Sequence, residues 1–287
     1  MSVLDIIILG IVQGLAELLP VSSSAHVVVT EKLLHLDPSS PPMTLLLVML
    51  HTGTMFAVIV YFWRQWRDTY FASQRTFTHF AQLVIVATVL TVIIGGLLVW
   101  VIEHQARGAA GGAQVEDLFS HLELIAPALA VAGVLILVAG ALEHRTTADG
   151  STADLTPRQA GIIGAVQGLC LPFRGFSRSG ATISTGMLLG VRKARVEAFS
   201  FALAVILTPA VVGREALRLL HWGHGERAAE LTSDTLLSVL GALVAFGAGL
   251  VALRWLSRWL EAGRWYLFGI YCLVAAAAVA ALHHAGY

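Results

Sequence analysis

Two stretches of the sequence resemble each other: "GIVQGLAELLPVSSSAH" at residues 10–26 and "GAVQGLCLPFRGFSRSGAT" at residues 164–182. The second copy has one extra residue. Each lies in an apolar segment that Pro, Ser and Gly interrupt midway, and three uninterrupted apolar stretches follow each copy. The two copies therefore define an internal repeat of about 155 residues, and this repeat predicts the fold.

The composition indicates a membrane protein. Of the 287 residues, 57% are hydrophobic and 13% are charged, whereas soluble domains have about twice that share of charge. The formal net charge is zero, so the charge balance gives no reason to expect a nucleic-acid partner. Apolar stretches of about 20 residues are long enough to cross a bilayer. The clearest are residues 43–63, 79–101, 122–142, 197–220, 234–253 and 265–285.

The basic residues of the loops predict the orientation. Four alternate loops are rich in Lys and Arg, and the positive-inside rule places such loops in the cytoplasm. The interrupted segment 5–34 then enters and leaves from the outer side, whereas segment 160–190 enters and leaves from the inner side. The Trp and Tyr residues at 61–70 and 265–271 are typical of interfacial belts. The rich loops contain Arg64, Arg67, Arg75, Arg145, Arg158, Arg192, Lys193, Arg195, Arg254, Arg258 and Arg264, and the others only Lys32, Arg107 and Arg227.

We therefore predict an all-α polytopic membrane protein with six spanning helices plus two re-entrant helical hairpins in an inverted-topology repeat. The first repeat covers residues 1–142, with its hairpin at 5–34 followed by three spans. A cytoplasmic linker covers 143–159. The second repeat covers 160–287, with its hairpin at 160–190 followed by three spans. Two such hairpins are expected to meet near the middle of the membrane.

The first hairpin contains acid–base groups. Irregular backbone at membrane depth is tolerated only inside protein or beside a water-filled cavity, and ionisable residues there are functional candidates. Glu17 is a candidate base or ligand of a hard metal ion, and His26 a candidate proton donor or acceptor. Ser22 and Ser23 are candidate donors or nucleophiles. His51, in "LHTGT", is expected to line the first span near the site, in a supporting role.

The second hairpin has the groups that bind phosphate. Gly175 and Gly180 allow backbone N–H groups to turn toward an anion, and Arg178 offers a planar charged fork. A helix that begins near Thr182 would add its N-terminal dipole. Short hydroxyl donors accompany them, namely Ser177, Ser179 and Thr182. An anion cradle that faces an acid–base pair predicts phosphoryl chemistry at a depth that suits a lipid headgroup.

These motifs resemble those of the undecaprenyl pyrophosphate phosphatase family, the integral-membrane bacitracin-resistance type. One family motif reads Glu-Gly-x-x-Glu, followed by Leu-Pro-Val-Ser-Ser and a His, and the other reads Pro-Gly-x-Ser-Arg-Ser-Gly-Ala-Thr. "QGLAELLPVSSSAH" and "RGFSRSGATIS" occupy those places here, and the likeness covers the whole chain. The resemblance implies hydrolysis of undecaprenyl diphosphate to the monophosphate and inorganic phosphate, which recycles the carrier lipid of peptidoglycan synthesis in the bacterial inner membrane. The residues it implies for the active site are Glu17, Ser22, Ser23, His26, Ser177, Arg178 and Thr182.

The residues and the resemblance together predict three groups of site residues. Catalytic roles are expected for Glu17, Ser23, His26 and Arg178. Phosphate-binding roles are expected for Ser22, Arg174, Gly175, Ser177, Ser179, Gly180 and Thr182. Supporting roles are expected for Gln13 and His51.

Two departures from the family pattern affect the cofactor. The resemblance implies a divalent cation, Mg²⁺ or Ca²⁺, for which Glu17 is the candidate ligand. Gln13 stands where the family commonly has its first Glu, and Arg174 stands where it commonly has Pro. Together they make the pocket about two charge units more favourable for a diphosphate. We therefore expect a weakened dependence on the cation, with Arg174 taking over part of its role.

Other functions remain open on the sequence alone. Inverted repeats with broken helices are also a transporter architecture, so the same anion site would suit a flippase of polyprenyl phosphate. The function of an intramembrane serine protease is a further alternative, but it would account for neither Arg178 nor the glycine-rich cradle. The nucleophile is water, Ser22 or Ser23, and the chain is a monomer or a homodimer. The first hairpin enters from outside, which favours a site that opens toward the periplasm.

Overall fold

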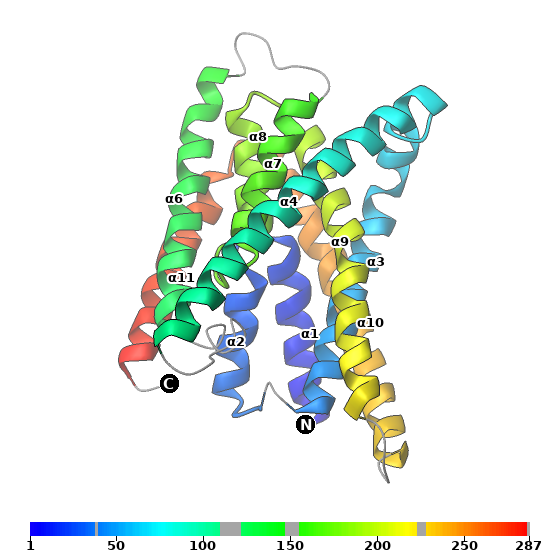
Figure 1. Ribbon diagram of the computed structural model, residues 1–287, viewed down its shortest axis with the longest axis vertical. Coiled ribbons are helices and arrows are strands. Elements are labelled where there is room, and N and C mark those ends of the chain that lie inside the picture. The colour runs from blue at the N-terminus through cyan, green and yellow to red at the C-terminus, as the bar shows by residue number, and fades with distance from the viewer. Residues whose placement is uncertain (38–39, 110–121, 147–154, 223–227, 286–287) are drawn as a thin grey trace.

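The computed structural model describes residues 1–37, 40–109, 122–146, 155–222 and 228–285, and these fold into ten helices (Figure 1). The expected all-α architecture is confirmed. The helices are α1 (Val3–Leu18), α2 (Ser23–Leu33), α3 (Pro41–Thr69), α4 (Gln74–Ala109), α6 (Leu122–Thr146), α7 (Pro157–Cys170), α8 (Arg178–Leu188), α9 (Lys193–Trp222), α10 (Ala228–Glu261) and α11 (Tyr266–His284).

Five of the six expected spans are confirmed as helices that are long and apolar enough to cross a membrane. They lie at Pro42–Thr69, Gln74–His104, Leu122–Leu142, Thr235–Glu261 and Tyr266–His284. The sixth, 197–220, falls in α9, a 30-residue helix with Pro209 inside it, and its role as a span stays a prediction. The middle of the expected linker 143–159, residues 147–154, lies outside the described residues, while α6 extends to Thr146 and α7 begins at Pro157.

The helices of the two interrupted segments match each other in detail. The N-cap Ser2 of α1 forms a capping box with Asp5, and the N-cap Thr156 of α7 forms one with Gln159, which satisfies the free N–H groups at both helix starts. The second helix of each segment, α2 or α8, has 11 residues. In Figure 1, α1 and α2 occupy the lower half of the molecule and α7 and α8 the upper half.

Glycine allows close approach of each first helix to a long one. A Cβ on Gly14 of α1 would collide with Ala245 and Ala248 of α10, and a Cβ on Gly164 of α7 would collide with the backbone of Ala87 in α4. Small residues at such positions let two helix backbones approach closely inside a membrane. As a result, each hairpin lies against a long helix from the other half of the chain.

The remaining helices complete the scaffold around the hairpins. α3 packs on α9, where the rings of Phe62 and Phe201 stack with centroids 5.4 Å apart. α6 packs on both α11 and α8. Apolar side chains of α4 such as Val92 and Trp100 stay exposed, as expected of a surface that faces lipid. Thus α6 lies against α8 of the second hairpin on one side and α11 on another.

Candidate active site

The tip of the first hairpin is an irregular turn between α1 and α2. Leu19 takes an extended conformation with φ −78° and ψ 152°, because the residue before a proline, here Pro20, is disfavoured in the helical region. Ser22 then has φ 67° and ψ 93°, a left-handed conformation that a residue other than glycine rarely adopts. This turn ends α1 just after Glu17 and starts α2 at Ser23.

The tip of the second hairpin depends on one glycine and one cap. Gly175 has φ +100°, and a Cβ there would lie 2.5 Å from the carbonyl oxygen of Ile125 in α6. Ser177 caps α8, since its Oγ accepts a hydrogen bond from the backbone N–H of Gly180 at 3.2 Å. The helix therefore begins at Arg178 and not near Thr182, which corrects the expectation. Its N-terminal turn lies at the tip of the hairpin.

The two tips touch each other, as expected. The backbone N–H of Gly175 donates to Ser24 Oγ at 3.3 Å, and Ser179 Oγ donates to the carbonyl oxygen of Leu19 at 3.3 Å. These two hydrogen bonds join segments that are 151 and 160 positions apart in the chain, and they fix the depth of one hairpin against the other.

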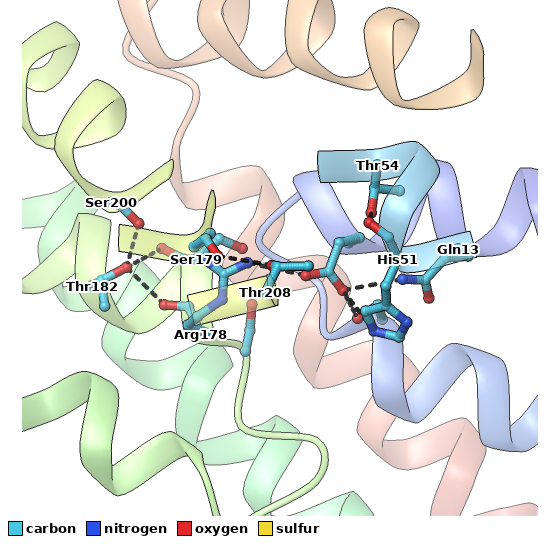
Figure 2. Close-up of polar contacts among 12 residues, drawn as sticks. Gln13, His51, Thr54, Arg178, Ser179, Thr182, Ser200 and Thr208 are labelled. Atoms are coloured by element: carbon cyan, nitrogen blue, oxygen red, sulfur yellow. Dashed lines mark hydrogen bonds and ion pairs between the residues drawn. The ribbon is translucent and has the colours of Figure 1, made fainter. Parts of the chain in front are cut away.

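Glu17 is the centre of the site. Its Oε1 accepts a hydrogen bond from Arg178 Nη2 at 3.0 Å, and its Oε2 accepts from Ser23 Oγ at 2.5 Å and from Gln13 Nε2 at 3.3 Å. His51 Nε2 lies 3.9 Å from Oε2. The side chain of Glu17 is only 19% exposed, and every one of these neighbours can stabilise its negative charge. Figure 2 shows Gln13 and His51 on one side of this cluster and Arg178 on the other.

One hydrogen-bond donor of Arg178 has no partner among the described residues. Its side chain is 22% exposed, and its Nη1 atom is buried with no hydrogen-bond partner among the described residues. A buried guanidinium nitrogen without an acceptor is costly. The free edge of the fork thus suits an anion with paired oxygens, such as a phosphate.

His26 is not part of this cluster. Its Nδ1 lies 2.7 Å from the carbonyl oxygen of Ser22, and its Nε2 lies 2.6 Å from the hydroxyl of Tyr271 in α11. The two rings also stack, with centroids 5.6 Å apart. Both ring nitrogens therefore have partners, and neither partner is Glu17 or Arg178.

Several expected phosphate-binding hydroxyls have other partners. The buried Thr182 Oγ1 contacts Ser200 Oγ at 2.6 Å and donates to the carbonyl oxygen of Arg178 at 2.8 Å, so it supports the first turn of α8 (Figure 2). Ser22 Oγ bonds to Ser24 Oγ at 3.2 Å. These positions surround the cluster of Glu17, Ser23 and Arg178 without joining it.

Arg174 lies apart from the Glu17 cluster. Its side chain is exposed, and its charge acts on Glu31 of α2. Glu31 itself is buried, with one carboxylate oxygen that lacks a hydrogen-bond partner among the described residues. The structure therefore gives Arg174 a neighbour that the sequence analysis did not consider.

Two residues of α11 that support the first tip were not expected from the sequence. Tyr271 contacts His26, and Cys272 Sγ lies 3.4 Å from the carbonyl oxygen of Pro20. The sequence places Tyr271 in an interfacial belt because it follows Trp265 and Tyr266 closely. No local pattern distinguishes a tyrosine at the lipid interface from one that bonds to a residue in another helix.

The donor set around Glu17 does not fit a resident divalent cation. Glu17 is the only carboxylate of the cluster, and guanidinium, hydroxyl and amide donors already occupy both of its oxygens. No group of three His, Cys, Asp or Glu side chains forms a metal site within the described part of the chain. Mg²⁺ commonly takes one or two carboxylates together with substrate phosphates, so a cation would need its further ligands from the substrate.

Comparisons with known proteins agree over nearly the whole chain. The sequence profile described as "Bacitracin resistance protein BacA" matches residues 6–278. A protein of Acinetobacter baylyi named "Undecaprenyl-diphosphatase 2" is 54% identical over 285 residues, which cover 98% of each chain. Proteins named "Undecaprenyl-diphosphatase" from Desulfosudis oleivorans and Gluconacetobacter diazotrophicus are 34% and 35% identical, and the matches cover 93% and 96% of this chain and 94% and 95% of theirs.

Proposed function

This chain belongs to the family of the bacitracin resistance protein BacA, and we propose that the tips of its two hairpins form the active site of an undecaprenyl-diphosphatase. The enzyme hydrolyses undecaprenyl diphosphate to undecaprenyl phosphate and inorganic phosphate. One observation supports this location above all. Ser23 from the first hairpin and Arg178 from the second bond to opposite oxygens of Glu17.

Arg178 binds the terminal phosphate. Its buried Nη1 has no partner among the described residues, while Nη2 stays paired with Glu17. The first turn of α8 adds the positive end of a helix dipole at the same place. As the bond to phosphorus breaks, charge grows on the phosphate oxygens, and the guanidinium stabilises that charge.

Ser23 is the nucleophile. Its hydroxyl donates to Glu17 Oε2 at 2.5 Å, which is the arrangement of a nucleophile and its base. Ser22 lacks this arrangement, because its hydroxyl bonds to Ser24. Glu17 takes the proton of Ser23 as its Oγ bonds to the terminal phosphorus. The bond from phosphorus to the bridging oxygen breaks, and undecaprenyl phosphate leaves, taking up the proton from Glu17.

Water then releases the second product. Glu17, again ionised, takes a proton from a water molecule as its oxygen attacks the phosphoserine. The bond between phosphorus and Ser23 Oγ breaks, and Glu17 returns the proton to Oγ. Inorganic phosphate leaves, and the starting state of Glu17 and Ser23 is restored.

The two halves of the chain form an inverted repeat in the bacterial inner membrane, with the site open toward the periplasm. Three features support the repeat: the matching capping boxes of α1 and α7, the equal lengths of α2 and α8, and the packing of each first helix on the long helix of the other half. The basic residues of the alternate loops support its orientation. The flippase alternative receives no support from the relatives, since the three described above are named as diphosphatases.

Phosphate release from undecaprenyl diphosphate by purified protein in detergent tests the function, because micelles offer no second compartment for transport. Wild type should turn over, and Glu17→Gln should lose at least about 100-fold in rate. Thr78→Ala, at the exposed start of α4, is the control for handling. A well-folded wild type without turnover at any cation concentration would overturn the proposal.

A further inference from the structure

Helix α11 contacts the tip of the first hairpin through two adjacent residues. The hydroxyl of Tyr271 lies 2.6 Å from His26 Nε2, and Cys272 Sγ donates to the carbonyl oxygen of Pro20 at 3.4 Å. Tyr271 and His26 are 245 positions apart in the chain. The proposed chemistry uses neither of them. His26 nevertheless bonds to Ser22, the residue before Ser23, and Tyr271 bonds to His26.

The backbone of Ser22 requires such support. Its φ of 67° is unfavourable for a side chain with a Cβ, and conformations of this kind persist only where the surroundings hold them. The carbonyl oxygen of Ser22 accepts from the backbone N–H of His26 at 3.3 Å and lies 2.7 Å from His26 Nδ1. His26 therefore forms two hydrogen bonds to the carbonyl oxygen of Ser22, one from its backbone and one from its ring.

The carbonyl oxygen of Ser22 determines the tautomer of the His26 ring, and Tyr271 completes the pairing of that ring. A carbonyl oxygen can only accept, so His26 Nδ1 carries the hydrogen and donates it to Ser22. In the neutral ring Nε2 is then an acceptor, and the hydroxyl of Tyr271 donates to it. The bond to Tyr271 and the stacking of the two rings thus hold the ring in the orientation in which it bonds to Ser22.

The direction of the Ser23 side chain depends on these hydrogen bonds from His26 to Ser22. Ser23 directly follows Ser22, and its Oγ reaches Glu17 only from the first turn of α2. A rotation of the Ser22 backbone toward an ordinary conformation would turn that hydroxyl away. Because Arg178 belongs to the other hairpin, the same rotation would leave its guanidinium in place.

We propose that Tyr271 is a positioning residue of the phosphatase reaction: acting through His26, it holds Ser22 in the left-handed conformation that directs Ser23 Oγ at Glu17. His26 is accordingly a positioning residue and does not transfer protons with the substrate. The inference rests on the proposed role of Ser23 as nucleophile.

Steady-state kinetics of Tyr271→Phe, with purified full-length protein and undecaprenyl diphosphate in detergent, tests the proposal. The substitution removes one hydroxyl and keeps the ring. We expect kcat to fall about tenfold, roughly the effect of one well-formed hydrogen bond. KM should stay within about twofold, because Arg178 still binds the phosphate. Tyr266→Phe is the matched control on the same helix, where that residue packs against Gly140 of α6, and it should keep the wild-type kcat.

His26 variants separate positioning from proton transfer. The side-chain amide introduced by His26→Asn keeps a nitrogen donor where Nδ1 lies but cannot reach Tyr271, so this variant should retain a larger part of kcat than His26→Ala does. Adding Tyr271→Phe to His26→Asn should then cost nothing further, as two residues that act through one another are not additive. Thermal unfolding in detergent should show each variant folded.

Each contrary result has a distinct meaning. A full kcat in Tyr271→Phe, or a loss that falls on KM alone, would overturn the role of Tyr271. An inactive but folded His26→Asn, no better than His26→Ala, would make His26 a proton-transfer group. If Ser23→Ala itself turned over normally, the proposed nucleophile would be wrong, and the positioning of Ser23 would fall with it.

Discussion

Ser23 Oγ donates a hydrogen bond to Glu17 Oε2 across 2.5 Å, although a turn of four residues separates α1 from α2. The same carboxylate accepts from Arg178 at its other oxygen. One side chain thus contacts both Ser23, the proposed nucleophile of the first hairpin, and Arg178, the proposed phosphate-binding group of the second. In the proposed reaction Glu17 exchanges a proton through Oε2 while Oε1 stays paired with Arg178.

Removing the hydroxyl of Ser23 should abolish turnover. We expect Ser23→Ala to lose at least about 1,000-fold in kcat, since the covalent step loses its nucleophile. Ser22→Ala should lose much less, because the hydroxyl of Ser22 bonds to Ser24 and, among the described residues, not to Glu17. Acid quench followed by intact-protein mass spectrometry should detect a phosphoryl group on wild type and none on Ser23→Ala. Phosphoryl transfer to Ser22 instead would reassign the nucleophile.

Arg178→Lys should show how far the planar fork matters beyond its charge. Lysine keeps the positive charge, but its donors share one nitrogen, so it lacks the planar fork in which Nη2 pairs with Glu17 while a separate nitrogen, Nη1, is left for phosphate. We expect a loss of about 100-fold in kcat/KM, measured by phosphate release. Arg64→Lys, in the last two turns of α3, is the matched control. Equal activity of Arg178→Lys and wild type would show that the reaction needs the positive charge of Arg178 but not its planar guanidinium.

Arg174→Ala should lose less activity than Arg178→Ala does. The side chain of Arg174 is exposed and its charge acts on Glu31, while Arg178 contacts Glu17 directly. We expect a loss of less than about tenfold in kcat/KM, consistent with a weak interaction at an exposed site. A loss as large as that of Arg178→Ala would show that Arg174 binds phosphate, as expected from the sequence.

Gln13→Glu should increase the response to Mg²⁺. It places a second carboxylate beside Glu17, within the reach that Gln13 Nε2 now has, and two carboxylates with substrate phosphates suit Mg²⁺. We expect the ratio of rates with Mg²⁺ and with chelator to be larger in Gln13→Glu than in wild type. Complete loss of wild-type turnover in chelator would contradict the weakened cation dependence that Gln13 predicts.

Gly175→Ala should destabilise the protein, because φ is +100° and the added Cβ would meet the carbonyl oxygen of Ile125. We expect a cost of about 2 kcal/mol, visible as a lower midpoint of thermal unfolding in detergent. Gly96→Ala in α4 is the control. A Cβ there meets no atom within 4 Å, so it should leave stability unchanged or raise it by less than about 1 kcal/mol. Equal midpoints for the two variants would show that the second tip tolerates rearrangement.

The sequence by itself determined the helices and the places where they break. Apolar length predicted six spans, and five of them are helices long and apolar enough to cross a membrane. Proline and serine predicted the interruption between α1 and α2. Those features depend on neighbours along the chain, through hydrogen bonding within a helix and the fixed φ of proline. The resemblance between the copies also predicted that Glu17, His26, Arg174 and Arg178 come to one place. Of these, Glu17 and Arg178 form a hydrogen bond across 161 positions, whereas His26 bonds to Ser22 and Tyr271.

Only the tertiary structure decided which side chains of each tip face each other. His26 turns to Tyr271, Thr182 turns to Ser200, and Ser177 caps α8, so three expected site residues support the tips. The first hairpin packs on α10 and α3 and bonds to α11, and the second packs on α4, α6 and α9, so the depth and rotation of each depend on several helices together. No local sequence pattern predicts how these contacts combine, because each one joins residues far apart in the chain. Each contact stabilises the fold only after the others have formed.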